Sequence, residues 1–336
     1  MEKDIAHIVY ASDDRFAEIL GVSLVSLYEN SRDMRDIVVY ILESGISEDN
    51  QRKLDYLSNK YKRHSIVWIK AKNITEELQM EVNTDRGSLS QYARLFISSI
   101  LPPDLDRVLY LDCDVIIRKS IRELWNVNIC GNIIGALMDA FSKYYRKNID
   151  LEPKDLMFNS GVMLIDLKEW KEKHIEDKLI CFIKKKHGLI QQGDQGALNA
   201  VLCHNTYCIE PRFNSVTIFY DFTYKEMLLY RDPPYFYPEI EVKKAIEDPS
   251  IVHFTTSIFS KRAWMKECNH RYVGEWLCYK TMSPWKDTPL WDDTRPKWKR
   301  LAGRFLKLLP RNITIRVARI AQVYLRPMKY RFFSAI

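Results

Sequence analysis

In the first hundred residues, short apolar runs alternate with longer stretches whose apolar residues recur at helical spacing. Three runs predict β-strands, at 5–10, 37–42 and 65–69. Between them, the pattern at 19–28 predicts a helix, and Ser47 opens a capping sequence before a second helix that ends near residue 61. Strands that alternate with helices are typical of an α/β fold. We therefore expect a Rossmann-like, mostly parallel mixed sheet with helices on both faces.

The pattern continues less regularly to residue 254. We expect an amphipathic helix at 90–100, ended by two prolines. Further apolar runs predict strands, at 107–117, 133–138, 158–165 and 251–254. Helices are expected from about 167 and within 191–200, whereas the aromatic, proline-rich segment 228–238 is expected to be an ordered loop.

Two acids interrupt the most apolar of these runs, because Asp112 and Asp114 stand between 108–111 and 115–117. Acids near the end of a buried strand are costly unless something compensates them. Side chains i and i+2 of a strand share a face, and ligand crevices form at the carboxyl ends of parallel strands. The pair therefore suggests a site for a divalent cation and a diphosphate. A strand-to-loop turn in which Asp caps free amides is the alternative.

The amino-acid composition, and the cysteines above all, indicate the cellular compartment. The apolar fraction of 46% and the charged fraction of 28% are ordinary for a globular protein. The seven cysteines form no Cys-x-x-Cys pair, which favours reduced thiols and a cytoplasmic protein and argues against zinc. We see no N-terminal targeting signal and no uncharged apolar window of about 18 residues, so we expect no membrane-spanning helix.

Positive charge is concentrated at the C-terminus. Residues 294–336 hold twelve Lys or Arg and no acid, so the remaining 39 bases and 44 acids give residues 1–293 a net charge of −5. We therefore divide the chain into a catalytic domain, 1–280, and a basic amphipathic segment, 281–336. This distribution argues against nucleic-acid binding over the domain.

The C-terminal segment has helical spacing on both sides of Pro310. Ile313, Val317, Ile320 and Tyr324 fall on one helical face, flanked by Arg316 and Arg319. A basic, amphipathic helix of this kind predicts peripheral attachment to an anionic membrane surface, here the inner face of the cell membrane. The alternative is a tail packed on the catalytic domain.

Six short motifs occur in the same order as in a known enzyme family. They are Ala11-Ser12-Asp13, Tyr92-Ala93-Arg94, the run from Leu109 to Asp114, the run from Phe158 to Gly161, Gly193-Asp194-Gln195, and His253 with Lys261. Over roughly 5–264, the chain resembles glycosyltransferase family 8, especially the bacterial lipopolysaccharide galactosyl- and glucosyltransferases. The resemblance implies a GT-A type domain and a metal-dependent, retaining hexosyltransferase.

The resemblance also implies roles for individual residues. Ala11 and Asp13 would bind uracil and ribose, and Phe16 could stack on the base; an N-cap of the next helix is the alternative for Asp13. Asp112, Asp114 and His253 would ligate Mn²⁺, or else Mg²⁺. The remaining candidates for binding the nucleotide sugar are Arg94 and Lys261 as diphosphate cations, with Cys113, Ser160 and Thr256. Asp139, Asn159, Asp194 and Gln195 would surround the sugar.

Two positions depart from the family pattern. Arg15 stands where the family often has Asn. In the family pattern His-x-x-Gly-x-x-Lys, Thr256 takes the Gly place, and two extra residues precede Lys261. A backbone approach that requires glycine is therefore altered here.

The implied reaction moves galactose or glucose from UDP-galactose or UDP-glucose to a glycan or glycolipid acceptor, such as lipopolysaccharide core or capsule. Retention allows two mechanisms. Gln195 is a poor nucleophile, which favours same-face attack with its amide stabilising the oxocarbenium-like centre, whereas Asp194 is the alternative nucleophile for double displacement. Two other functions remain open: a haloacid-dehalogenase-like phosphatase that uses Asp112, and a catalytically inactive membrane-bound adaptor.

Overall fold

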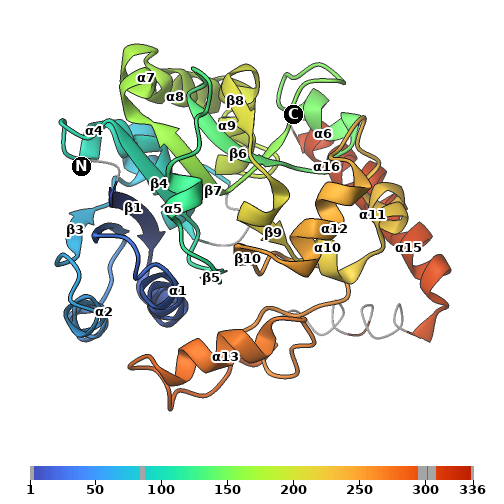
Figure 1. Cartoon of the computed structure of the whole chain (residues 1–336). Coiled ribbons are helices and arrows are strands. Elements are labelled where there is room, and N and C mark those ends of the chain that lie inside the picture. The colour runs from blue at the N-terminus through green and yellow to red at the C-terminus, as the bar shows by residue number, and fades with distance from the viewer. Residues whose placement is uncertain (1–3, 84–87, 294–300, 302–307, 334–336) are drawn as a thin grey trace.

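A seven-stranded sheet and a three-stranded sheet form the centre of the molecule (Figure 1). The computed structural model describes residues 4–83, 88–293, 301 and 308–333. The large sheet has the order β3-β2-β1-β4-β7-β6-β8, and the small one β5-β10-β9. The strands are β1 (Ile5–Ser12), β2 (Asp36–Glu43), β3 (Val67–Lys70), β4 (Arg107–Leu111), β5 (Val115–Ile117), β6 (Ile134–Met138), β7 (Phe158–Asp166), β8 (Thr206–Cys208), β9 (Ser215–Val216) and β10 (Ile251–His253).

The large sheet is mixed and mostly parallel, as predicted. β1 pairs in parallel with β2 and β4, β2 with β3, and β6 with β8. Strand β7 runs antiparallel to both β4 and β6. The carboxyl ends of β1 and β4 therefore lie at one edge of the sheet, where ligands bind in folds of this kind.

Helices cover both faces of this sheet. The longer helices are α1 (Ala17–Asn30), α2 (Glu48–Lys60), α8 (Ile175–Lys185), α9 (Asp194–Leu202), α11 (Tyr224–Arg231), α12 (Glu239–Glu247), α13 (Val273–Thr281), α15 (Arg311–Arg319) and α16 (Arg326–Phe333). The shorter ones are η2 (Asp14–Phe16), α3 (Ile74–Leu78), η3 (Leu89–Phe96), α4 (Ile97–Ile100), α5 (Arg122–Trp125), α6 (Lys143–Asn148), α7 (Leu167–Glu172), η4 (Cys203–Asn205), η5 (Pro211–Asn214), α10 (Ile218–Asp221) and η6 (Ile320–Leu325).

Alternate residues of β1 serve two apolar cores. Ile8 and Tyr10 pack with α1 and α2 on one face, and Val9 packs with η3, α7 and α8 on the other. This alternation is what a central strand covered on both faces requires. All three residues are buried, so β1 lies at the centre of the domain beneath the loops at the edge of the sheet.

Three predicted elements differ from the structure. The run 107–117 is not one strand, because the chain turns at the two acids and β5 pairs with β10 in the second sheet. Segment 90–100 is helical, but it is a 3₁₀ helix followed by one α-turn and not one continuous α-helix, and residues 92–96 are all buried. The loop expected at 228–238 begins inside α11, which a Thr223–Glu226 capping box starts.

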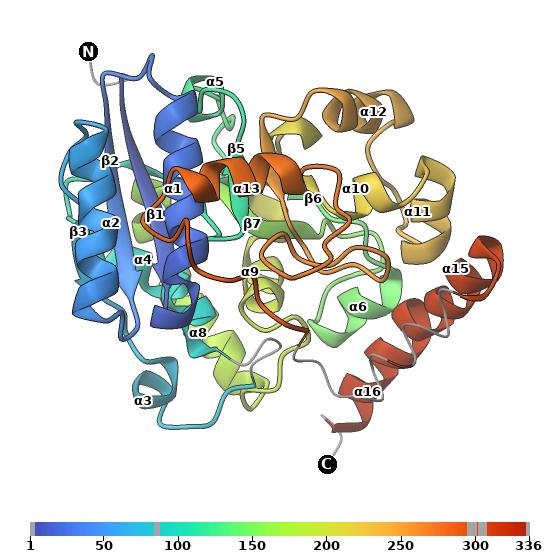
Figure 2. The same cartoon turned by 90° about the horizontal axis from the view of Figure 1, so that it is seen from below.

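The C-terminal helices pack along the domain beside α11 and α6 (Figure 2). Ile315 and Ala318 join an apolar cluster with α11, and Gln322 exchanges hydrogen bonds with Tyr145. Three of the four residues of the predicted stripe point away from this contact, since Ile313, Val317 and Ile320 are exposed. The fourth, Tyr324, instead lies with its ring 5.3 Å from that of Tyr144 in α6. The helix thus has a packed face and an exposed apolar face. The first predicted half, 300–309, falls mostly outside the described residues.

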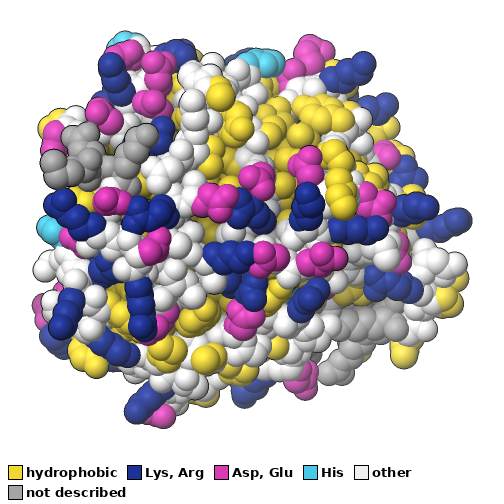
Figure 3. Space-filling model, in the orientation of Figure 1, with side chains coloured by type: hydrophobic (Ala, Val, Ile, Leu, Met, Phe, Trp, Pro, Cys, Tyr) yellow, Lys and Arg dark blue, Asp and Glu magenta, His cyan; other side chains and the backbone are white. Residues whose placement is uncertain are grey.

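Residues just after 280 also pack on the domain. Trp285 is buried against Gly21 of α1, where an added Cβ would approach the indole to 2.3 Å. The division at 280 and 281 remains a prediction. No helix among the described residues is long and apolar enough to cross a membrane. Figure 3 shows basic and acidic side chains interspersed over one face of the molecule.

Candidate active site

Two loops bring Asp112, Asp114 and His253 together. Asp112 follows β4, Asp114 precedes β5, and His253 ends β10, which pairs with β5. His253 Nε2 lies 3.1 Å from Asp114 Oδ1 and 3.8 Å from Asp112 Oδ2. One ligand atom from each residue falls within 4.8 Å of the others, and Nε2 is buried with no hydrogen-bond partner among the described residues. Two carboxylates and one imidazole match the donor set of a divalent ion such as Mn²⁺.

Gly161 of β7 allows this group to form. A Cβ at this position would lie 2.2 Å from His253 Cε1 and 2.9 Å from Asp112 Oδ2. The Gly161 carbonyl also accepts a hydrogen bond from Asp112 N at 2.8 Å. The glycine of the Phe158–Gly161 motif is therefore required by close approach, because any side chain would displace a ligand.

A second group with metal-binding atoms lies outside this site. Asp155, Cys203 and His204 also bring one ligand atom each within 4.8 Å. The His204 side chain is 76% exposed, whereas that of His253 is 2% exposed. Burial raises the pKa of the Cys203 thiol, which disfavours the thiolate needed for binding. The buried group is the better metal candidate.

A cavity of about 130 Å³ opens beside the buried group. Its lining includes many of the predicted residues: Ala11, Phe16, Arg94, Asp112, Cys113, Asp114, Ser160, Asp194 and Gln195. Residues that sequence reasoning missed also line it: Ser12, Ser88, Ser90, Gln91, Tyr110 and Gln192. Ser12 and Tyr110 lie inside the motifs, and Gln91 and Gln192 adjoin them, so position in or next to a motif was the available signal.

Asp13 does not line the cavity. Its Oδ1 accepts from Phe16 N at 3.1 Å, as an N-cap of η2, and its Oδ2 accepts from Ser88 Oγ at 2.8 Å. The capping alternative is therefore observed. Cys113 is held close by, because its thiol donates to the Ala11 carbonyl at 3.3 Å, and burial raises its pKa.

Arg94 is enclosed by acids. Its Nη2 donates to Asp112 Oδ1 at 2.8 Å, and its Nε lies 3.1 Å from Asp194 Oδ2. The guanidinium also stacks over the Tyr110 ring at 4.3 Å. Burial alone would lower the pKa of Arg94, but the carboxylates of Asp112 and Asp194 outweigh it and raise that pKa. Arg94 thus joins the metal group to the Asp194 motif.

The Lys261 side chain does not pair with Asp112 or Asp114. Its Nζ bonds to Glu267 Oε2 at 2.8 Å on the surface. The next residue, Arg262, instead pairs with Asp114 and donates to Thr256 Oγ1 at 2.9 Å. The altered base lies in the loop that has two residues more than the family pattern. Arg262 was missed by the sequence analysis.

Gln195, at the start of α9, lies among polar groups. Its Oε1 accepts from Ser160 N at 3.3 Å and lies 3.5 Å from Asn159 Nδ2. Its Nε2 lies 3.5 Å from Asp139 Oδ2. Asp139 and Asn159 do not line the cavity but stand directly behind Gln195. Burial raises the pKa of the Asp139 carboxyl.

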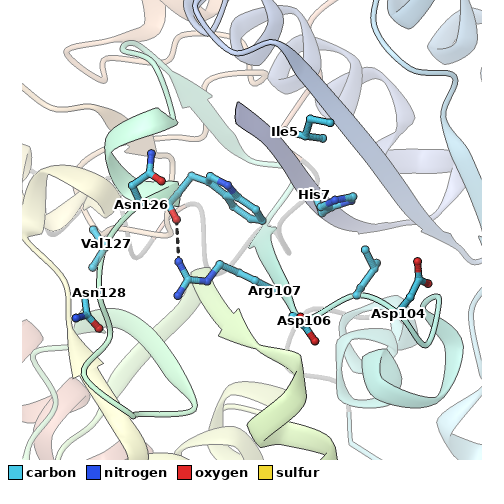
Figure 4. Close-up of a pocket in the computed structure, with 10 residues that line it drawn as sticks. Ile5, His7, Asp104, Asp106, Arg107, Asn126, Val127 and Asn128 are labelled. Atoms are coloured by element: carbon cyan, nitrogen blue, oxygen red, sulfur yellow. Dashed lines mark hydrogen bonds between the residues drawn. The ribbon is translucent and has the colours of Figure 1, made fainter. Parts of the chain in front are cut away.

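A larger hollow of about 490 Å³ lies at the other end of the same strands (Figure 4). Ile5 and His7 at the start of β1 and Arg107 at the start of β4 line it, and Arg107 donates to the Trp125 carbonyl at 3.1 Å. Because these residues begin their strands, this hollow is separate from the carboxyl-end site.

Known proteins share both the sequence pattern and the fold. The family model described as Glycosyl transferase family 8 matches residues 7–266. The general stress protein A of Bacillus subtilis is 29% identical over 289 residues, which cover 85% of this chain and 96% of that protein. The lipopolysaccharide 1,2-glucosyltransferase of Escherichia coli is 25% identical over 285 residues, covering 84% and 79%.

Solved structures agree on the architecture. The structure of galactosyltransferase LgtC in complex with donor and acceptor sugar analogs matches with a TM-score of 0.69 at 24% identity. The match covers 88% of this chain and 99% of that one, and it shows the GT-A type fold. Together with the family match over most of the length, these findings establish that the chain belongs to glycosyl transferase family 8.

Proposed function

We propose that the protein transfers galactose or glucose, with retention, from a UDP-sugar to a cell-surface glycan acceptor such as lipopolysaccharide core or capsule. One observation carries the proposal: the buried Asp112, Asp114 and His253 group borders a cavity that also contains Gln195. The relatives named as lipopolysaccharide glucosyl- and galactosyltransferases support this choice of substrates.

Asp112, Asp114 and His253 would hold Mn²⁺, with Mg²⁺ as the alternative. Carboxylate oxygens and an imidazole suit Mn²⁺, and the orphaned His253 Nε2 supplies a lone pair for it. When bound, the ion neutralises charge that develops on the leaving diphosphate.

Basic side chains of the protein would also neutralise negative charge on the diphosphate. Arg262, which pairs with Asp114, would be one cation for a diphosphate bound at this group. Arg94 lines the cavity and also pairs with Asp112 and Asp194, so it would be the second diphosphate cation while holding both acids. The uridine would lie near Ala11, Phe16 and Cys113, with Ser160 and Thr256 toward the diphosphate.

Gln195 would stand below the sugar, with Asp139 and Asn159 beside it. In same-face transfer the bond from the anomeric carbon to the diphosphate breaks while the bond to the acceptor oxygen forms. The acceptor proton passes to the departing phosphate oxygen. The ion pair between Asp194 and Arg94 supports this route, because it makes the Asp194 carboxylate a weaker nucleophile.

We also propose that the C-terminal helix attaches the enzyme to an anionic membrane surface. Its exposed stripe, Ile313, Val317, Ile320 and Leu325, lies among Arg316, Arg326 and Lys329. Because another face packs on the domain, attachment would hold the active site at a set orientation to the lipid.

A donor screen tests the proposed function. UDP release should be measured from UDP-galactose and UDP-glucose, with and without a glycan acceptor. We expect release from one of them and no phosphate from phosphomonoesters. Phosphomonoester hydrolysis would support the phosphatase alternative, and inactivity toward every nucleotide sugar would support an adaptor.

A further inference from the structure

Asn214 is a fully buried amide between the metal group and the sugar side of the site. It is the last residue of η5, immediately before β9, which runs parallel to β10. Its Oδ1 lies 3.0 Å from His253 Nδ1, and its Nδ2 donates to Asn159 Oδ1 at 2.9 Å. No motif in the sequence marks this residue.

The directions of these hydrogen bonds follow from one backbone group. Gly161 N is always a donor, and it donates to the Asn159 side chain at 3.0 Å, so the atom facing it must be the carbonyl oxygen. Asn214 also faces that oxygen, so it must present its NH₂ group. The remaining Asn214 oxygen, which only accepts, therefore faces His253 Nδ1.

This sequence of donors and acceptors fixes the state of the imidazole. Nδ1 must carry a proton, so in the neutral ring it is Nε2 that has the lone pair, directed toward Asp114 Oδ1 and Asp112 Oδ2. Metal-ligating histidines commonly donate their other N–H to a neighbouring oxygen, which fixes both tautomer and ring orientation.

We propose that Asn214 is a positioning residue that holds His253 in the tautomer that binds metal and couples it to Asn159. The inference rests on the proposed metal site. Through Asn159, the same amide supports the residue that stands beside Gln195. One side chain thus sets the orientation of a group at the metal through one bond and of a group beside Gln195 through the other.

The tautomer of His253 can be measured in the metal-free protein, without an activity assay. In the metal-free, ¹⁵N-histidine-labelled protein, two-bond ¹H–¹⁵N NMR spectra report which ring nitrogen carries the proton. The chain has seven histidines, and the His253→Gln variant identifies the signals of His253. We expect protonated Nδ1 in the natural protein. Protonated Nε2 together with an unprotonated Nδ1 would overturn the proposal even if the enzyme proves active, and protonated Nδ1 in an inactive protein would still support the assigned hydrogen bond to Asn214.

Two variants separate positioning from folding. Asn214→Leu keeps the size but removes both bonds, so Mn²⁺ affinity, measured by electron paramagnetic resonance with UDP present, should fall about 10- to 100-fold, and the tautomers should mix. Asn214→Asp retains an acceptor for Nδ1–H but cannot donate to Asn159, so the tautomer should persist while kcat falls.

Asn30→Leu is the matched control. Asn30 also makes several side-chain hydrogen bonds, to Ser26, Ile117 and Tyr279, but outside the site. Its replacement should leave Mn²⁺ affinity within twofold of the natural protein. Equal loss of affinity in Asn30→Leu, or unchanged affinity in a folded Asn214→Leu, would show that Asn214 has only a structural role.

Discussion

Each acid of the metal group is bonded to an arginine in this structure: Asp112 to Arg94, and Asp114 to Arg262. Arg94 is buried and also held by Asp194, so it is a fixed part of the site. Arg262 lies in the loop after β10 and is partly exposed. Under the proposed function, Arg94 would hold Asp112 and Asp194 in place at the cavity wall, and Arg262 would turn from Asp114 to a bound diphosphate.

Arg262→Ala should raise the KM for the UDP-sugar about 10- to 100-fold, because a charge-assisted hydrogen bond contributes about 1.5–3 kcal/mol. Lys261→Ala is the neighbouring control and should change KM less than twofold, since Lys261 bonds to Glu267 on the surface. Steady-state kinetics with the UDP-sugar measures the KM of each variant. The reverse ranking would restore Lys261 as the diphosphate cation.

Gln195→Ala should lower kcat by roughly 100-fold, the usual effect of losing one preorganised electrostatic contact, with a smaller change in donor KM. The reason is that Gln195 would stabilise positive charge that develops only in the transition state. NMR of the freshly formed glycoside should show the donor's anomeric configuration. An inverted product would refute the retaining mechanism.

At the scale of elements, the C-terminal helix is tied to α11 by an ion pair. Arg311 donates to both oxygens of Glu226, and this hydrogen bonding lowers the pKa of Glu226 to about 2. A carboxyl group whose pKa is lower in the folded state stabilises the fold at pH values above the pKa that it has in the unfolded chain, here 4.5. That stabilisation is lost as the pH falls from 4.5 toward about 2.

Amide hydrogen exchange in α15 should therefore accelerate between pH 5 and pH 3, after correction for intrinsic rates. Glu226→Gln should show fast exchange already at pH 5 and little further change on acidification. Exchange in α1, which lies far from this pair in the fold (Figure 2), serves as the internal reference. An equal pH response in both proteins would contradict the role of Glu226.

Sequence reasoning succeeded where the signal was local. Apolar runs located most strands of the large sheet, and the motifs located most of the residues that line the cavity. Sequence reasoning failed where contacts between distant segments determine the structure. Whether Lys261 or Arg262 faces Asp114 depends on the path of a loop. Asn214 comes next to His253 only because η5 packs beside β10. The break at Asp112 likewise depends on pairing between distant strands β5 and β10.

At the scale of the whole molecule, the exposed stripe on the C-terminal helix should govern membrane binding. Replacing Ile313, Val317 and Ile320 together by Ser should abolish flotation with anionic liposomes, while UDP release from soluble donor stays within twofold. High salt should weaken but not abolish binding of the natural protein, because salt screens the basic residues and not the apolar insertion.

The control for this experiment is Ile240→Ser on α12, an exposed apolar residue outside the stripe. This variant should float like the natural protein. Deletion of 294–336 is a poorer test, because it also uncovers the apolar cluster that receives Ile315 and Ala318. Continued flotation of the triple variant would place the membrane contact elsewhere.

The central claim is that Asp112, Asp114 and His253 hold a metal needed for transfer from a UDP-sugar. Its most direct test is UDP release by EDTA-treated protein, measured before and after addition of Mn²⁺, for the natural chain and for Asp114→Asn. The account predicts no release without metal, recovery with Mn²⁺ in the natural protein, and almost none in the variant, which loses a ligand charge at nearly constant size. Full activity in the EDTA-treated, metal-free protein would contradict it.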